Sequence, residues 1–324
     1  MDPLIAVVVS TRDRPRRLAR LLAALQTQTL DASRYEVIVV DNGIAPHPPG
    51  HTGTPLTIGD AALGGLDIRV LRPGTPGGPA AGRNLGWRAA RAPLIAFTDD
   101  DCEPTAGWLE AVLAAAGRHP GAIVQGRTRP LAAERYNDGL LVHTVHIDAL
   151  GPQYETCNIV YPRVVLSALD GFDERFGSEP AGEDTDLAWR ALAAGHTAVF
   201  APDAIVHHAV IALSPRDALR RAGRWSAVVR VFAHHPGARV MLHRRYFWNV
   251  WHYLVWRSVL SILAPRWLRR LVLARHALSL TRRARKAGVR GPSLLAAVPF
   301  LAIHDAVECA AIARGALQAR TLVL

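Results

Sequence analysis

Short apolar runs alternate with amphipathic helical patterns through the first part of this chain. Strands that alternate with helices indicate a parallel α/β sheet with helices on both faces. In such sheets, ligands bind at the carboxyl ends of the strands. The predicted strands lie at 4–9, 35–40, 68–71, 94–97 and 197–200, the predicted helices at 16–25, 83–90 and 107–116, and loops rich in proline and glycine at 45–65 and 73–82, with a turn at 202–203.

Three consecutive carboxylates, Asp99, Asp100 and Asp101, follow one of these apolar runs. Aspartate is a poor strand residue, and crowded carboxylates repel one another unless a cation or strong donors neutralise them. Hard carboxylate oxygens suit Mg²⁺ or Mn²⁺, which share their remaining ligand positions with substrate phosphates. An acidic turn or a helix N-cap would explain one aspartate, but three favour metal and phosphate chemistry. Asp41 also lies at a predicted strand end, so we expect it to share one site with the cluster.

Charge is distributed unevenly along the 324 residues. Between Arg216 and Arg290 there are 18 basic residues and one acid, a net charge of +17, so the other 20 basic and 26 acidic residues give −6. A block of this kind interacts with phosphate in nucleic acid, on an anionic membrane or in a substrate. The pattern also becomes helical near residue 213. We therefore predict a catalytic domain at 1–212 and a basic, tryptophan-rich helical extension at 213–324.

The extension has two interpretations that the residues leave open. Trp248, Trp251 and Val255 share one helical face beside arginines, which is typical of an interfacial amphipathic helix. An apolar stripe at helical spacing is equally typical of a lid that packs on the catalytic domain. The apolar segments 246–264 and 294–313 contain charged residues and histidines, so neither is predicted to be a clean transmembrane span.

Cysteine usage and the start of the chain bear on localisation. Three cysteines without metal-ligand spacing fit a reduced, cytosolic protein. The sequence starts almost directly with a predicted strand, and no secretory signal is expected. We expect a cytoplasmic protein, with the basic extension as a peripheral contact to the inner face of the plasma membrane.

An ordered series of motifs resembles glycosyltransferase family 2 over about residues 4–210. The family's fold is GT-A, a Rossmann-like, mainly parallel sheet with flanking helices, and the resemblance implies that a sugar is transferred from a nucleotide donor with inversion at the anomeric carbon. The order of the motifs makes the match specific, because each alone is weak. The matching segments are Val7–Arg14, Val39–Gly43, Ala81–Gly86, Phe97–Cys102, Cys157–Asn158, Gly171–Phe176 and Gly182–Leu187.

On the donor side, the resemblance implies roles for the acidic cluster. Asp99 and Asp101 match the family's DxD motif and would hold Mg²⁺ or Mn²⁺ against the diphosphate, with Asp100 on the ribose side; the metal would act as a Lewis acid on the leaving group. Asp41 would contact the base or ribose, and an Asx-turn before Gly43 is a compatible alternative.

Two further residues are expected on the nucleotide, and one histidine on the metal. Thr11 would line the nucleotide pocket. Arg83 would bind nucleotide or phosphate, or else it is a solvated arginine in the first turn of a helix. Of His207 and His208, alignment by eye favours His208 as a further metal ligand, although a single histidine is more often a packed or surface residue.

On the acceptor side, the family's ED motif assigns the catalytic base to Asp184. Glu183 would orient the acceptor or raise the pKa of its neighbour. Acids near a helix start are also favoured by the helix dipole and by capping, which accounts well for Asp186 and less well for the adjacent Glu183 and Asp184.

The resemblance implies a nucleotide-sugar donor, most often with UDP, and a glycan or lipid-linked acceptor in cell-envelope or surface glycan assembly. A sugar-nucleotide nucleotidyltransferase is an alternative, but it would have a glycine-rich phosphate loop after the first strand, and residues 10–14 contain no glycine. A basic protein that binds nucleic acid or a membrane is a third. No nucleic-acid partner is expected, since the basic block contains no recognisable DNA- or RNA-binding motif.

Overall fold

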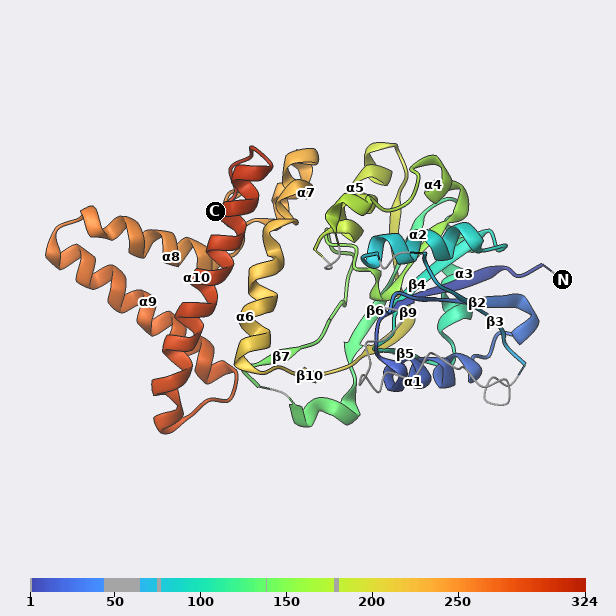
Figure 1. The fold of residues 1–324 in the computed structure, drawn as a ribbon, viewed down its shortest axis with the longest axis horizontal. Coiled ribbons are helices and arrows are strands. Elements are labelled where there is room, and N and C mark those ends of the chain that lie inside the picture. The colour runs from blue at the N-terminus through green and yellow to red at the C-terminus, as the bar shows by residue number, and fades with distance from the viewer. Residues whose placement is uncertain (1, 44–64, 75–76, 138, 178–180) are drawn as a thin grey trace. The chain divides into compact units, whose positions relative to one another are not determined.

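The computed structural model describes residues 2–43, 65–74, 77–137, 139–177 and 181–324, which form two compact units (Figure 1). Unit 1 comprises Met1–Ala132 and Thr144–Ala209, and unit 2 comprises Ala133–His143 and Val210–Leu324. The loop expected at 45–65 lies, apart from Gly65, outside the described residues.

Unit 1 is built on a mixed sheet whose first half is parallel, which confirms the predicted α/β class. In spatial order the strands are β3 (Asp67–Leu71), β2 (Tyr35–Asp41), β1 (Ile5–Thr11), β4 (Leu94–Asp99), β8 (Ile159–Pro162), β6 (Ile123–Pro130), β9 (Ala198–His208) and β5 (Cys102–Pro104). β1 pairs in parallel with β2 and β4, and β2 pairs in parallel with β3. β8 is antiparallel to β4 and β6, β6 and β9 are parallel, and β5 is antiparallel to β9.

Helices cover both faces of this sheet, so its central strands are apolar on both sides. The helices are α1 (Pro15–Gln26), α2 (Pro79–Ala89), α3 (Trp108–Arg118), α4 (Arg163–Ala168) and α5 (Glu183–Ala193). Val7 and Val9 of β1 pack in one core cluster with residues of α1 and α3, whereas Ala6 and Val8 pack in a second cluster with residues of α2, α4 and α5. The period of two along a strand produces this separation.

α2 begins at Pro79, four residues earlier than predicted. Pro79 occupies the first helical turn, where its fixed φ favours helix initiation. Gly82 is not a loop residue: a Cβ there would lie 2.3 Å from Asn42 Nδ2 and 2.4 Å from Ser10 Oγ. At Gly86, a Cβ would lie 2.4 Å from Val8 Cγ1. Both glycines therefore let α2 approach the sheet closely.

The turn predicted at Pro202 and Asp203 is a bulge inside a longer strand. β9 runs from Ala198 to His208, and its pairing with β6 shifts between Gly126 and Arg127. A bulge accommodates a proline that would otherwise interrupt the ladder. The strand therefore continues as far as His208.

Unit 2 is mainly helical, which confirms the predicted helical extension. A short two-stranded sheet, β7 (Val142–His143) and β10 (Ile211–Ala212), accompanies the helices. These are α6 (Pro215–Gly223), α7 (Val229–His234), α8 (Val250–Leu260), α9 (Arg266–Lys286) and α10 (Leu294–Gln318), and short 3₁₀ turns in the two units include η1 (Ala32–Arg34), η3 (Ala132–Asn137), η4 (Thr156–Asn158), η5 (Glu174–Phe176), η6 (Arg224–Ser226), η7 (Pro236–Met241), η8 (Ser261–Leu263) and η9 (Gly291–Ser293).

The charged residues of the segment around α10 led us to expect that it is no clean membrane span, but the segment meets the length and composition of one. By length and composition alone, Gly291–Gln318 is long and apolar enough to cross a membrane, and 39% of its apolar stretch is buried within the protein. Its two acids are paired inside unit 2: Asp305 with Arg283 at 2.7 Å, and Glu308 with His252 at 3.0 Å. These polar partners are what buried acids of a core helix require.

Candidate active site

Three neighbouring strand ends bring the predicted donor-side residues to one edge of the sheet. Thr11 lies opposite Asp41 in the β1–β2 register, and Ser10 lies opposite Asp99 in the β1–β4 register. Asp99 is the last residue of β4, and Asp100 and Asp101 form the turn that leads into β5. The sheet topology therefore gathers these side chains, as the alternating pattern predicted.

Asp100 is buried and bound directly to Thr11. Thr11 Oγ1 donates to Asp100 Oδ2 at 2.7 Å, and Arg14 Nη1 donates to Asp100 Oδ1 at 3.0 Å and to Asp101 Oδ2 at 3.1 Å. Burial raises the pKa of Asp100 to about 6, Asp101 adds to the rise, and Arg14 opposes it. The arginine thus partly neutralises two crowded carboxylates.

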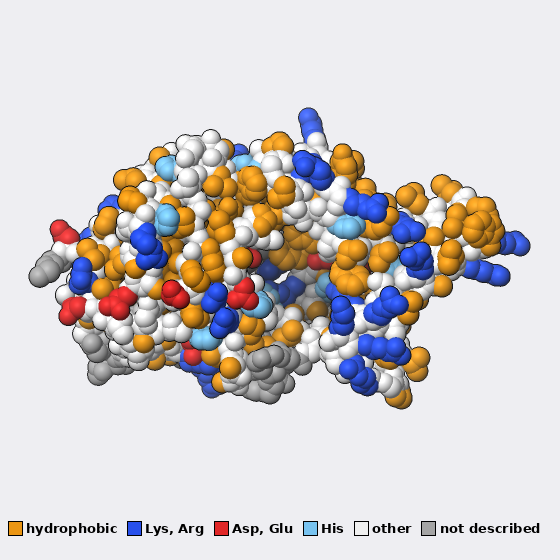
Figure 2. Space-filling view, turned by 180° about the vertical axis from the view of Figure 1, so that it is seen from behind, with side chains coloured by type: hydrophobic (Ala, Val, Ile, Leu, Met, Phe, Trp, Pro, Cys, Tyr) orange, Lys and Arg blue, Asp and Glu red, His pale blue; other side chains and the backbone are white. Residues whose placement is uncertain are grey.

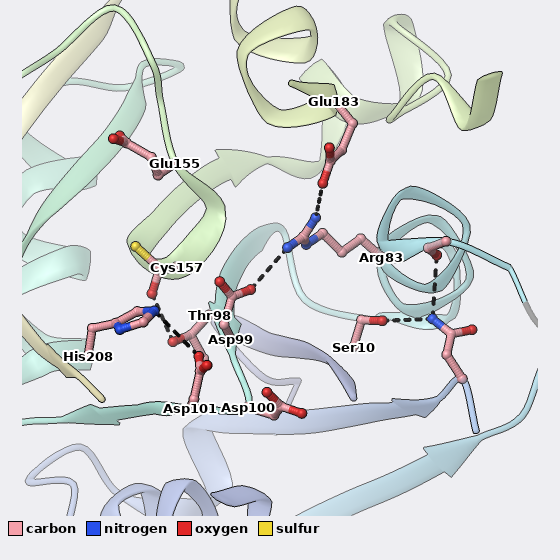
Figure 3. Close-up of polar contacts among 12 residues, drawn as sticks. Ser10, Arg83, Thr98, Asp99, Asp100, Asp101, Glu155, Cys157, Glu183 and His208 are labelled. Carbon is pink, nitrogen blue, oxygen red and sulfur yellow. Dashed lines mark hydrogen bonds and ion pairs between the residues drawn. The ribbon is translucent and has the colours of Figure 1, made fainter. Parts of the chain in front are cut away.

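Arg83 connects the donor-side acids to the acceptor-side acids, as Figure 3 shows. Its Nη2 donates to Asp99 Oδ1 at 3.0 Å, and its Nη1 donates to Glu183 Oε1 at 2.8 Å. Only 6% of Arg83 is exposed, so the alternative of a solvated arginine is wrong. Burial by itself would lower the pKa of Arg83, but Asp99 and Glu183 raise the pKa by more than burial lowers it. The guanidinium therefore keeps its charge.

The two acids of the acceptor-side motif open α5 and have different environments. Glu183 is 2% exposed and fully engaged, because its Oε2 also accepts from the Ala181 N–H at 2.9 Å. Asp184 Oδ1 accepts from the Thr185 N–H at 2.8 Å. Burial, and then the charge of Glu183, raise the pKa of Asp184 well above its ordinary value, against the opposing effect of Arg83. A carboxylate with a raised pKa is suited to accept a proton near neutral pH.

Asp186 lies on the same first turn and has a structural role. Its Oδ2 accepts from Arg190 Nε at 2.8 Å, one helical turn further on. The N-cap of α5 is Gly182, which makes no side-chain cap, so the ion pair with Arg190 accounts for Asp186 rather than the predicted capping.

A candidate metal centre lies where β5 and β9 pair. Asp101, Cys102 and His208 each offer a ligand atom, and these atoms lie within 4.8 Å of one another. His208 Nε2 is 3.5 Å from Asp101 Oδ1, and its Nδ1 is 2.7 Å from the Ala209 carbonyl oxygen. In the β5–β9 register, His208 lies opposite Cys102, whereas His207 lies opposite Glu103. Of the two histidines, His208 is therefore the one beside the acidic cluster.

The chemistry of these donors fits a divalent cation. A carboxylate oxygen and an imidazole nitrogen are ordinary ligands of such ions. Burial raises the pKa of the Cys102 thiol, so Cys102 is a neutral neighbour rather than a ligand for a hard ion. Asp99 is not a member of this group of three; its carboxylate pairs with Arg83, and 32% of its side chain is exposed.

Asp41 makes the Asx-turn that the sequence allowed. Its Oδ1 accepts from the Gly43 N–H at 3.0 Å, and its Oδ2 accepts from Arg72 Nε at 3.3 Å. The side chain remains partly exposed at the strand end. The turn therefore fixes the carboxylate beside Thr11 without burying it.

Sequence reasoning named no role for Arg14 or Glu155. Arg14 lies just after the first strand, inside one of the motifs. Its position near the predicted strand ends that carry the acids could have indicated that it pairs with them. Glu155 is partly buried, and burial raises its pKa. It also contributes to the raised pKa of Asp184, and its sequence context gave no such signal.

Two buried asparagines in the motifs hold the loops around the site. Asn84 Oδ1 accepts from the Phe172 N–H at 2.9 Å, and its Nδ2 donates to the Phe172 carbonyl at 2.9 Å. Asn158 Oδ1 accepts from Trp108 Nε1 at 2.9 Å, and its Nδ2 donates to the carbonyls of Arg127 and Ala204. These amides replace backbone partners that the irregular loops lack.

A mixed sheet of this order, with acids at the ends of β2 and β4 and at the start of α5, is a GT-A fold, and comparison with solved structures agrees. Staphylococcus aureus TarS 1–349 in complex with UDP-GlcNAc superposes with a TM-score of 0.53 at 15% identity, over 99% of this chain and 93% of that one. The mannosyltransferase PcManGT from Pyrobaculum calidifontis, in complex with GDP-Man and Mn²⁺, gives a TM-score of 0.53 at 18% identity, over 99% and 88%.

Within this class the chain resembles glycosyltransferase family 2, as the motifs predicted. The family profile "Glycosyl transferase family 2" matches residues 6–156, and the profile "Glycosyl transferase family group 2" matches residues 153–302. The pre-mycofactocin glycosyltransferase of Mycobacterium tuberculosis is 31% identical over 217 residues, which are 63% of this chain and 42% of that protein. The glycosyltransferase AglE of Haloferax volcanii is 27% identical over 212 residues, 64% of this chain and 67% of that protein. The chain thus spans under half the length of the first of these relatives.

Proposed function

We propose that this protein is an inverting glycosyltransferase that moves a sugar from a nucleotide-diphosphate donor to an acceptor hydroxyl. The observation that carries the proposal is the line of side chains from Asp99 through Arg83 to Glu183, with Asp184 beside it. It links the strand ends where a diphosphate would lie to Asp184, a half-buried carboxylate with a raised pKa. Inversion requires these two groups on opposite sides of one anomeric carbon.

Asp184 is the proposed base. Its carboxylate removes the proton of the acceptor hydroxyl as that oxygen attacks the anomeric carbon. The bond from the anomeric carbon to the diphosphate oxygen breaks, and its electron pair leaves with the nucleotide diphosphate. Glu183 raises the pKa of Asp184 and holds Arg83, so it is a positioning residue.

The donor would lie along the ends of β1, β2 and β4. We assign Thr11, Asp41, Asp100 and Asp99 to nucleotide recognition, and Arg83 to the phosphate side. The hydroxyl of Thr11 already orders Asp100, and Asp41 is fixed by its turn. Backbone and side-chain groups at strand ends are the usual ligands of nucleotides in α/β sheets.

Asp101 and His208, with Asp99 when it turns from Arg83, would hold the divalent cation, Mg²⁺ or Mn²⁺. A cation bound there would supply Lewis-acid stabilisation of the departing diphosphate. The Mn²⁺ in the PcManGT complex and the donor set of the candidate centre support this assignment.

The same comparisons support a nucleotide-sugar donor. UDP is the first choice of nucleotide, since TarS was crystallised with UDP and UDP-GlcNAc; GDP is the second, from PcManGT. The acceptor would be a glycan or a lipid-linked sugar of the cell envelope. We further propose that residues 1–212 form the catalytic domain and that residues 213–324 form an extension that holds it at the inner face of the cytoplasmic membrane.

Calorimetric titration of UDP, GDP and dTDP, with Mn²⁺ and then with EDTA, tests the proposal. We expect one nucleotide to bind in a metal-dependent manner, and we expect Asp99→Ala/Asp101→Ala to abolish this binding. Asp203→Asn, a change of an exposed acid in the β9 bulge, is the matched control and should bind as the wild type does. A well-folded wild-type protein that binds none of the three nucleotides would refute the transferase assignment.

A further inference from the structure

Large apolar side chains are strongly exposed where the helical hairpin of α8 and α9 turns. Leu263 is 88% exposed, Ile262 is 66%, Leu260 is 63% and Trp267 is 68%. Residues of these types are normally among the most buried, and a contiguous exposed group of them marks an interaction surface. Figure 2 shows hydrophobic side chains gathered beside lysine or arginine side chains at the corresponding right-hand end of the view.

The exposed surface continues along one side of α9. Trp267, Leu271 and Leu278 recur at i, i+4 and i+11, and the last two are 51% and 47% exposed. The opposite side of α9 is the one that packs inside unit 2: Leu280 and Ala284 are buried in a cluster with residues of α10. The stripe of Trp267, Leu271 and Leu278 is therefore a second apolar face, in addition to the one that builds the core of unit 2.

Arginines flank this stripe on both sides. Helical periodicity places Arg270 on one flank and Arg275 and Arg282 on the other. Arg257, Arg275 and Arg282 also line a cavity of about 200 Å³ between α8 and α9, together with Leu254, Val272 and Ser279, and its lining contains no acid. The only acid between Arg216 and Arg290 is Asp217, so the surrounding charge is strongly positive.

We propose that the hairpin of α8, η8 and α9 is a membrane-docking element that lies in the interface of an anionic bilayer. Leu263 and Trp267 enter the boundary between head groups and acyl chains, and the flanking arginines bind lipid phosphates. An apolar stripe with cationic flanks is the pattern of an interfacial helix, and each arginine near an anionic surface adds to the attraction. Binding of nucleic acid would use the arginines but would leave the exposed leucines in water.

This inference names the membrane contact behind the peripheral location proposed above, but it rests on unit 2 alone. Sedimentation of the 324-residue protein with vesicles of phosphatidylcholine, with and without phosphatidylglycerol, tests it. We expect binding to the vesicles with phosphatidylglycerol, weakened by salt. Leu263→Ser/Trp267→Ser should lower the partition constant at least tenfold, and each of Arg270→Gln and Arg275→Gln should lower it about fivefold.

The matched control is Leu295→Ser/Leu317→Ser on α10, where the two leucines are 82% and 81% exposed but lie outside the stripe. This variant should sediment as the wild type does. Equal sedimentation of the Leu263/Trp267 variant and the wild type would overturn the proposal. So would retention on heparin without vesicle binding, or self-association in light scattering that the same variant abolishes. Nucleotide titration on the same samples separates the two proposals, because the hairpin variants should bind nucleotide normally.

Discussion

Replacing Glu183 by glutamine tests the buried ion pair that joins the two halves of the site. The Arg83 and Glu183 side chains are 7% and 3% exposed, and their ion pair spans 2.8 Å. Both carboxylate oxygens of Glu183 accept a hydrogen bond, one from Arg83 and one from the Ala181 N–H. An amide offers a single acceptor oxygen, so in Glu183→Gln either Arg83 or the backbone N–H loses its partner and meets an NH₂ group.

Breaking a buried ion pair on one side costs about 3–5 kcal/mol, because the remaining charge is left without compensation. Asp99 still lies 3.0 Å from Arg83 and is partly exposed, so we place the cost at the lower end, about 3 kcal/mol. This corresponds to more than a hundredfold increase in the local opening equilibrium of α2 and α5. Hydrogen exchange of the peptides that cover Pro79–Ala89 and Glu183–Ala193 measures it directly.

Asp170→Asn is the control, because it breaks an ion pair of similar length that is exposed instead of buried. Arg88 on the same helix pairs with Asp170 at 2.7 Å, but these side chains are 43% and 92% exposed. Asp170 has a positive φ of 55°, which asparagine tolerates. Exposed pairs contribute little, so this variant should leave exchange unchanged. If Glu183→Gln changes exchange no more than Asp170→Asn does, the reasoning from burial is refuted.

Three further predictions concern the base, the acidic cluster and the packing of α2. Asp184→Asn should lower the rate of sugar transfer about 10²–10⁴-fold and leave nucleotide binding intact. Because the pKa of Asp184 is raised, the wild-type transfer rate should begin to fall at a pH above the ordinary aspartate range as the pH is lowered. A transfer rate that stays constant down to that range would contradict this role. Arg14→Met removes the positive charge that opposes the rise in the pKa of Asp100, which is about 6 in the wild type. In titrations across pH, metal-dependent nucleotide binding by this variant should therefore weaken most at acid pH. Arg12→Met, at an exposed arginine, should leave binding unchanged. Gly86→Ala should destabilise unit 1 by about 1–3 kcal/mol in denaturant unfolding, because the added methyl group would contact Val8. Gly117→Ala in α3 should stabilise unit 1, because its methyl group would meet open space. Equal effects of the two substitutions would refute the argument that Gly86 lets α2 lie close to the sheet.

The sequence determined the fold class because periodicity is a local property. The run from Ile5 to Val9 is apolar on both faces, and α1 repeats leucines at helical spacing, so both elements could be predicted from their neighbours in the chain. The position of the acids at strand ends was readable for the same reason. The predicted element boundaries were wrong where tertiary contacts determine the role of a glycine or proline, as at the start of α2 near Pro79 and in the β9 bulge.

Tertiary structure decided how the charged residues pair. Arg83 lies 100 residues from Glu183 in sequence, and Arg14 lies 86 residues from Asp100, so only the sheet topology brings them together. It also assigned His208 rather than His207 to the acidic cluster, through the register of β5 and β9. For the basic extension, the sequence supplied the apolar stripes and the charge, but not which stripe is core. Packing of Leu280 and Ala284 in the α10 cluster buries one face of α9 and leaves Trp267 and Leu271 exposed, because a helix can bury only the face that its neighbours cover.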